Sequence, residues 1–189
     1  MSLALTLAAA ALAVPDCPID RAAYRLNTAP EFTAGFVRQD RRKASVSDLA
    51  FWLKTPKRTF YFSFAAPMGH SGTYLVPDID PRVSTLLDDD EEHEATKRAT
   101  DGEPMMIDFD AFDAELKPFD APPQADNRPP ARLFARRLTQ ALWYDWVRAA
   151  ANDEKAEQES IPVGLFEPAG CGGPPRADKL HRLQPRPTN

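Results

Sequence analysis

The feature that most constrains the fold is a period of two in the sequence pattern along residues 19–76. It is clearest in three stretches rich in aromatic residues, at residues 32–37, 49–54 and 59–64. A period of two in such stretches is typical of strands that bury one face. A polar turn at residues 55–58 separates the last two stretches. We therefore predict that they pair as an antiparallel hairpin whose buried face carries leucine and phenylalanine.

Further along the chain, the period of a strand gives way to the period of a helix. Residues 73–76 and 105–112 predict two further short strands, whereas residues 130–159 predict a long helix. At a helical spacing, one apolar stripe collects Phe134, Leu138, Ala141, Leu142, Trp146 and Ala149. Strands followed by a helix favour an α+β fold, with a mainly antiparallel sheet packed by one long C-terminal helix. We expect this sheet to be an N-terminal β-meander of about five or six strands.

The first residues indicate that the protein is exported. Leu3 to Val14 form a run of about 12 largely apolar residues, too short for a membrane span but suited to a signal peptide cleaved before Val14. No lysine or arginine precedes the run, so we expect a translation start upstream of Met1 or a positive charge from the amino terminus alone. The alternative is a buried N-terminal helix of a cytosolic protein. We favour a periplasmic or extracellular protein with no transmembrane segment in the mature chain.

Composition along the chain predicts its division into segments. We expect residues 1–13 to be the signal peptide, residues 14–173 a single globular α+β domain, and residues 174–189 a disordered, proline-rich basic tail. Within the domain, a strongly acidic stretch interrupted by proline and glycine predicts an exposed loop near residues 82–103.

The chain has two cysteines, Cys17 and Cys171. Export places them in an oxidising compartment, where a pair of cysteines is expected to form a disulfide. This bond would join the mature N-terminus to the end of the folded domain. The alternatives are two free thiols or a bond between two molecules through Cys171.

Several classes of function are excluded or disfavoured. The net charge of −5 argues against a surface that follows a nucleic-acid backbone. No glycine-rich phosphate loop and no Cys-x-x-Cys pair is present, so no cofactor is predicted. The three histidines are scattered, and the acidic residues near Asp88 lack the glycine of a helix-loop-helix calcium site, so no metal site is predicted.

Three residues of the predicted helix are candidates for binding. Trp143 projects on the polar side beside Arg136, so either the tail covers it or it marks a contact surface. Asp145 lies in the middle of the apolar stripe, where a carboxylate requires a partner such as Arg148, a proton or a cavity. Whether Asp145 has a structural or a functional role stays open.

Two functions remain in competition. The first is a non-enzymatic binding or structural module whose partner is a protein, an envelope polymer or a small ligand. The second is a hydrolase of envelope material with a site assembled around His70 and Ser71. Their surroundings approach the Gly-x-Ser-x-Gly pattern but place Thr73 at the last glycine. Because no complete catalytic motif is present, we favour the binding module over the enzyme.

Overall fold

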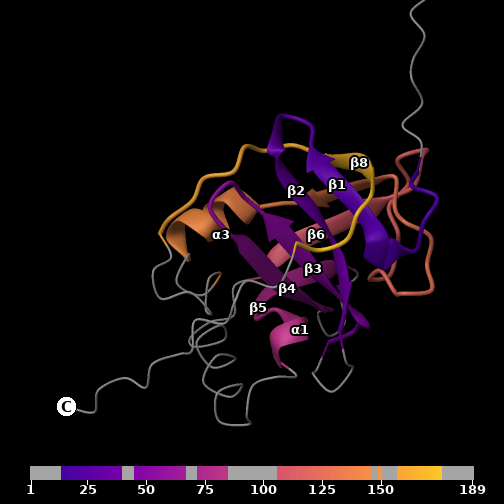
Figure 1. Ribbon diagram of the computed structural model, residues 1–189, viewed down its shortest axis with the longest axis horizontal. Helices are drawn as coiled ribbons and strands as arrows, with labels where there is room; N and C mark the ends of the chain where they lie inside the picture. The colour runs from indigo at the N-terminus through magenta and orange to yellow at the C-terminus, as the bar shows by residue number, and fades with distance from the viewer. Residues whose placement is uncertain are drawn as a thin grey trace, which may run out of the picture.

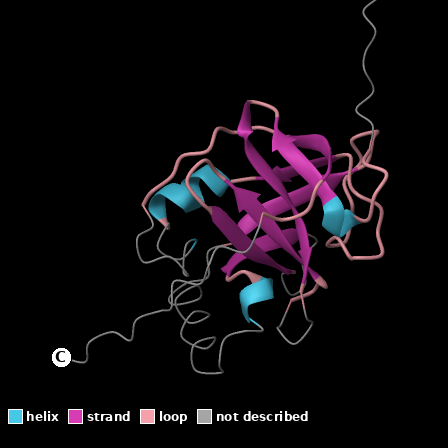
Figure 2. Cartoon of the chain, in the orientation of Figure 1, coloured by secondary structure: helices cyan, strands magenta, loops and turns pink. Residues whose placement is uncertain are grey.

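The structure is a computed structural model that describes residues 14–39, 45–66, 72–84, 106–145, 149 and 157–175. Strands dominate this part of the chain (Figures 1 and 2). The strands are β1 (Ala22–Leu26), β2 (Ala29–Arg38), β3 (Leu49–Lys54), β4 (Thr59–Ala65), β5 (Thr73–Asp78), β6 (Ile107–Phe112), β7 (Arg132–Ala135) and β8 (Phe166–Cys171). The helices are a 3₁₀ turn at Ile19–Arg21, α1 (Pro81–Ser84) and α3 (Leu138–Tyr144).

The eight strands close into a barrel in their order along the chain. Each strand is antiparallel to the next, and β8 returns to pair with β1. Closure removes the exposed sheet edges that would otherwise pair with other chains. A barrel of this strand number encloses a space just wide enough to be filled by side chains.

The predicted α+β fold with one long C-terminal helix is therefore wrong. Residues 132–135 of the predicted helix form β7, which pairs with β6, and the described helix α3 has only seven residues. The two elements meet at Arg137, whose φ of 65° is left-handed and cannot continue a helix. Leu133 points into the barrel and is fully buried, so its burial against the other strands outweighs the helical spacing of its neighbours.

The predicted hairpin is confirmed, because β3 and β4 pair with Phe51 opposite Phe62 and Leu53 opposite Phe60. The predicted open meander of about five or six strands is wrong, because its strands are part of a closed barrel of eight. No strand had been named at β1, β7 or β8.

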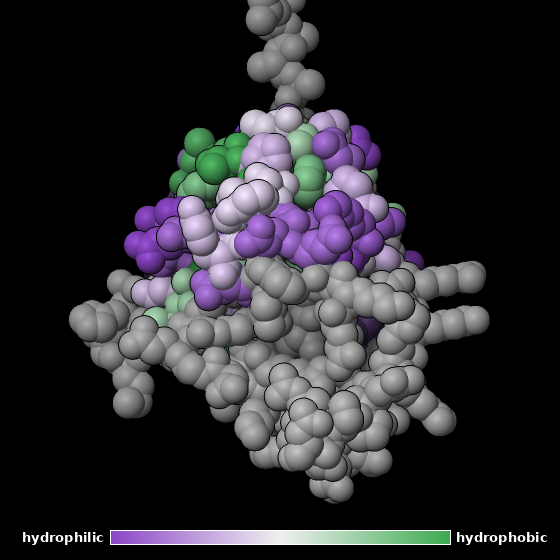
Figure 3. Space-filling view, turned by 90° about the vertical axis from the view of Figure 1, so that its left-hand side faces the viewer, coloured by the Kyte–Doolittle hydropathy of each residue, from purple (hydrophilic) through white to green (hydrophobic). Residues whose placement is uncertain are grey.

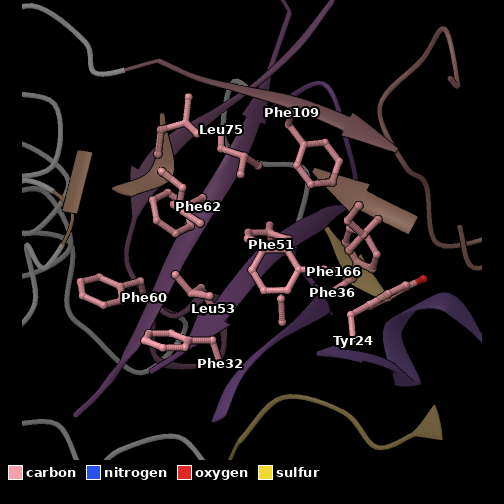
Figure 4. Close-up of a cluster of buried hydrophobic side chains, with 14 of the residues drawn as sticks. Tyr24, Phe32, Phe36, Phe51, Leu53, Phe60, Phe62, Leu75, Phe109 and Phe166 are labelled. Atoms are coloured by element: carbon pink, nitrogen blue, oxygen red, sulfur yellow. The ribbon is translucent and has the colours of Figure 1, made fainter. Parts of the chain in front are cut away.

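Aromatic rings fill the interior of the barrel. The buried rings of Phe51 and Phe109 face each other in the interior, with their centroids 5.5 Å apart (Figure 4). The buried ring of Phe64 lies 5.3 Å from that of Phe109 on the same measure. Among these apolar side chains Tyr24 keeps a hydroxyl, which donates a 2.9 Å hydrogen bond to the carbonyl oxygen of Pro130. Burial raises the pKa of Tyr24 well above its ordinary value.

One residue without a side chain shapes the outer wall. A Cβ on Gly35 would lie 2.8 Å from the ring of Trp52 and 2.7 Å from the carbonyl oxygen of Ala22. The absence of that atom lets the buried indole lie against the strand and donate from Nε1 to the carbonyl oxygen of Phe36 at 3.2 Å. The wall therefore buries a second, smaller cluster, formed by Val37, Ala50, Trp52 and Tyr61.

Candidate functional site

Strand β8 is paired very differently on its two edges. With β1 it pairs along its whole length, from Ala22 opposite Cys171 to Leu26 opposite Phe166. With β7 it makes a single pair, Leu133 opposite Phe166. Beyond this pair the chain leaving β7 turns into α3, and the chain entering β8 runs separately. A space opens between them.

This space is a groove of about 730 Å³ between α3 and residues 160–164, which we call the α3 groove. Buried apolar side chains reach it from below, namely Leu26, Leu138, Ile161 and Phe166. Its rim carries exposed large side chains: Trp143 is 43% exposed, and Tyr144 and Val163 are each 74% exposed. Figure 3 faces the α3 side of the molecule and shows apolar and hydrophilic surface next to each other there. The groove thus joins the barrel core to an aromatic surface.

Hydrogen bonds join the two walls of the groove to each other. The hydroxyl of Thr139 on α3 donates to the carbonyl oxygen of Ile161, and the amide of Glu159 donates to the carbonyl oxygen of Leu142 at 3.2 Å. The Glu159 carboxylate also accepts a 2.6 Å hydrogen bond from Nε of Arg58, and both side chains are largely buried. A buried ion pair of this kind fixes the geometry of its segment, because separating the charges would leave one of them unpaired.

The β1–β2 turn holds the second wall from the other side. The amide of Leu165 donates to Oδ1 of Asn27 at 3.1 Å, and the hydroxyl of Thr28 donates to the carbonyl oxygen of Val163 at 3.2 Å. A Cβ on Gly164 would lie 2.5 Å from Oδ1 of Asn27. Glycine is therefore needed for this close approach, and the groove is formed before any ligand binds.

The charged groups of the groove lie where β7 leads into α3. Arg136 is held by two contacts: its amide donates to the carbonyl oxygen of Asp108 at 2.8 Å, and its guanidinium lies 3.3 Å from the carboxylate of Asp110. Arg137 follows in the left-handed conformation and is exposed. Within the described residues, no hydrogen bond or ion pair of the Arg137 side chain is recorded. Among the described residues, contacts therefore hold the amide and the guanidinium of Arg136, whereas none holds the guanidinium of Arg137.

The structure brings two of the three predicted binding residues together. Arg136 and Trp143 both line the α3 groove. Asp145 does not line it; this residue is the C-cap of α3 and is half-buried, and its amide donates to the carbonyl oxygen of Ala141. Its predicted partner Arg148 lies outside the described residues.

Sequence reasoning missed the second wall of the groove. Residues 160–164 come from a short apolar segment that shows no periodicity. Hydrogen bonds to α3 and to the β1–β2 turn, together with the pairing of β8 with β1, hold them in place. The one signal in the sequence was Trp143 itself, a large aromatic residue placed among arginines.

The predicted disulfide is present. Cys17 and Cys171 are bonded, with their Cα atoms 6.2 Å apart, within the range that a disulfide requires. The bond links the segment before β1 to the end of β8, next to the longest pairing of β8. A disulfide is typical of proteins from oxidising compartments.

The residues of the competing hydrolase, His70 and Ser71, lie outside the described residues. The same holds for the signal peptide at residues 1–13, for residues 85–103 of the predicted acidic loop, and for residues 176–189 of the predicted tail. In the part of the chain that the structure describes, no three histidine, cysteine, aspartate or glutamate side chains are grouped as metal ligands. No described helix has the length and apolar character that a membrane span needs.

Comparison of this chain with protein-family models, with curated proteins and with solved structures finds no match. The geometry of the α3 groove is therefore the basis for assigning a function.

Proposed function

We propose that the protein is an exported, non-enzymatic binding module that holds a small ligand in the α3 groove. The observation that carries the proposal is a preformed groove of about 730 Å³ that has an aromatic rim. Ligand sites in proteins are typically concave, about 300–1,000 Å³ in volume, mainly apolar, and supplied with a few polar groups.

The shape of the barrel supports this location. Aromatic side chains fill the interior, so the space for a ligand lies outside the strands, where β7 and β8 diverge. The exposed Trp143 offers a flat apolar face that can stack on a ligand, and tryptophan is among the residues that contribute most to binding energy. These dimensions favour a small ligand over the protein or polymer partners that the sequence left open.

Export is the second part of the proposal. The Leu3–Val14 run has the length of a signal-peptide core, and the Cys17–Cys171 bond fits an oxidising compartment. Mass spectrometry of the protein purified from its source should find an N-terminus at or near Val14. Recovery of chains that begin at Met1 would contradict export.

Binding is tested with a neutral apolar fluorophore, N-phenyl-1-naphthylamine. We expect it to bind the wild-type protein with enhanced fluorescence, and to bind Trp143→Ala at least about tenfold more weakly, because the rim loses its largest apolar face. Phe119→Ala is the matched control, since Phe119 is also an exposed aromatic residue (45%) but does not line the groove. Equal weakening by both substitutions, or no binding to the wild type, would contradict the proposed site.

A further inference from the structure

The polar and apolar groups of the α3 groove are separated along its length. Arg136 and Arg137 immediately precede α3, whereas Trp143 and Tyr144 end it. Trp143 lies six positions after Arg137, which corresponds to about 9 Å along the helix axis. The groove therefore has a cationic end and an aromatic end.

The cationic end stands out against the charge of the whole protein. Among the described residues, the charged side chains that line the groove are those of Arg136, Arg137 and Asp108. The chain as a whole carries −5. Arg136 is already neutralised in part by Asp110, 3.3 Å away, which leaves Arg137 as the group best placed to receive an anion.

The conformation of Arg137 strengthens this assignment. Its φ of 65° lies in the left-handed region, which costs a residue with a Cβ free energy and which glycine would adopt without strain. Strained residues concentrate at functional sites. A guanidinium also offers several donors in a planar arrangement that matches the two oxygens of a carboxylate.

From these observations we infer that the ligand is an amphipathic monoanion whose carboxylate binds Arg137 and whose apolar body lies along α3 toward Trp143. This inference rests on the proposed function, because it names the class of ligand for the same groove. The buried side chains of Leu138 and Ile161 contact the apolar body from below.

The test compares two compounds that share a chain length and differ in charge. Decanoate is used below its critical micelle concentration and decan-1-ol below its solubility limit, and each displaces N-phenyl-1-naphthylamine from the folded protein. We expect decanoate to displace the fluorophore at a concentration about tenfold lower than decan-1-ol, because only the carboxylate makes a charge-assisted hydrogen bond. Decyltrimethylammonium, the cationic counterpart, should bind more weakly than decan-1-ol.

Substitution of Arg137 tests the contribution of its charge to binding separately from the contribution of the apolar side chains. In Arg137→Gln decanoate and decan-1-ol should displace the fluorophore at equal concentrations, and Arg137→Lys should restore part of the preference for decanoate. Arg128→Gln is the matched control, since Arg128 is exposed but does not line the groove. Thermal unfolding and circular dichroism of each variant establish that it folds.

The outcomes distinguish the inference from the proposed function. Equal affinity of the wild type for decanoate and decan-1-ol would overturn the anionic ligand class and leave the groove as an apolar site. A decanoate preference that survives in Arg137→Gln would overturn the role of Arg137. Failure of the fluorophore itself to bind would instead remove the proposed function. Decyl sulfate should displace the fluorophore less effectively than decanoate does. Equal displacement by the two compounds would overturn the assignment of a carboxylate in particular and leave amphipathic monoanions in general as the ligand class.

Discussion

Strand β8 closes the barrel through two seams of unequal strength. On one side the β1–β8 seam consists of five residue pairs, a disulfide, and hydrogen bonds between Arg21 and Gly172. On the other side the β7–β8 seam consists of one residue pair and a 3.9 Å ion pair between Arg132 and Glu167. The barrel is thus covalently reinforced on one edge of β8 and closed by a single residue pair on the other.

The difference explains where a ligand site can form in a filled barrel. The strong seam fixes β8, and with it the chain that precedes it, against β1. Because β7 and β8 share only one residue pair, residues 160–164 diverge from β7, and the α3 groove lies between them outside the aromatic core. One edge of β8 is firmly paired with β1, and the groove lies beside the other edge, which is barely paired with β7.

The largest effect is expected from breaking the strong seam. Replacing Cys17 and Cys171 with serine removes a crosslink that spans 154 residues of sequence. The loop-entropy model predicts a loss of up to about 5 kcal/mol in the free energy of unfolding. Urea denaturation measures the loss, and the wild type in reductant is the control. A loss below about 1 kcal/mol would mean that the strand pairs alone hold the seam.

Phe166 belongs to both seams, because it pairs with Leu26 on one side and with Leu133 on the other. Its substitution therefore tests both seams at once. Its ring is buried and lies 6.3 Å from that of Phe51. Phe166→Ala should lower the free energy of unfolding by about 4 kcal/mol, and it should also weaken fluorophore binding in the groove. The exposed Phe119→Ala should change stability by less than about 0.5 kcal/mol. Unchanged binding in Phe166→Ala would show that the groove is independent of the β7–β8 pair.

The hydrogen bond from Tyr24 to Pro130 connects β1 to the segment before β7, and so it supports the side of the barrel with the β7–β8 seam. Tyr24→Phe leaves the Pro130 carbonyl without its donor and should cost about 1–2 kcal/mol at neutral pH. Burial raises the pKa of Tyr24 in the folded state, so its neutral form is the stabilising one. Its contribution should be complete below the ordinary tyrosine pKa of about 10 and should be lost as the pH rises beyond it.

Alkaline denaturation measures this contribution. The wild type should lose stability above about pH 10, and Tyr24→Phe should lose less over the same interval. Part of the loss should remain in the variant, because burial also raises the pKa of Tyr61. Identical pH profiles for the two proteins would contradict the role given to Tyr24.

The smallest effect is expected at Arg137, on the side of the β7–β8 seam. Arg137→Gly should raise the free energy of unfolding by about 0.5 kcal/mol, because relief of left-handed strain exceeds the added freedom of the unfolded chain. Leu116→Gly is the matched control, since Leu116 has a φ of 64° and lies away from the groove. Both variants should gain stability, but only Arg137→Gly should lose the preference for decanoate. A loss of stability at Arg137 would mean that its side chain holds the fold.

The parts of this fold that were predictable depend on local pattern. Strands β3 and β4 place leucine or phenylalanine at every second position on either side of a short polar turn, so their pairing follows from neighbouring residues alone. Strand β8 contains Pro168 and Gly170, both unfavourable in strands, and exists because β1 offers it partners about 145 residues earlier in the chain. No local signal reports that kind of pairing.

The helix was mispredicted for a related reason. Leu138, Ala141 and Leu142 do share the buried face of α3, as the helical spacing indicates. Leu133 and Phe134 belong to β7, and the change between the two elements occurs at an arginine in a conformation usually adopted by glycine. For the site, Trp143 and Arg136 were predicted from their unusual placement. The facing residues 160–164 could not be predicted, because their position depends on the closure of the barrel.

The Cys17–Cys171 bond also makes the folded chain a covalent ring. All eight strands belong to the segment from Cys17 to Cys171, so every strand is part of the covalent ring. A protease that cuts one connecting loop opens this ring into a linear chain without releasing a fragment. Nicked protein should therefore migrate as one species on a non-reducing gel and separate into two only after reduction. In an environment that contains proteases, a single cleavage then leaves every strand attached to the others.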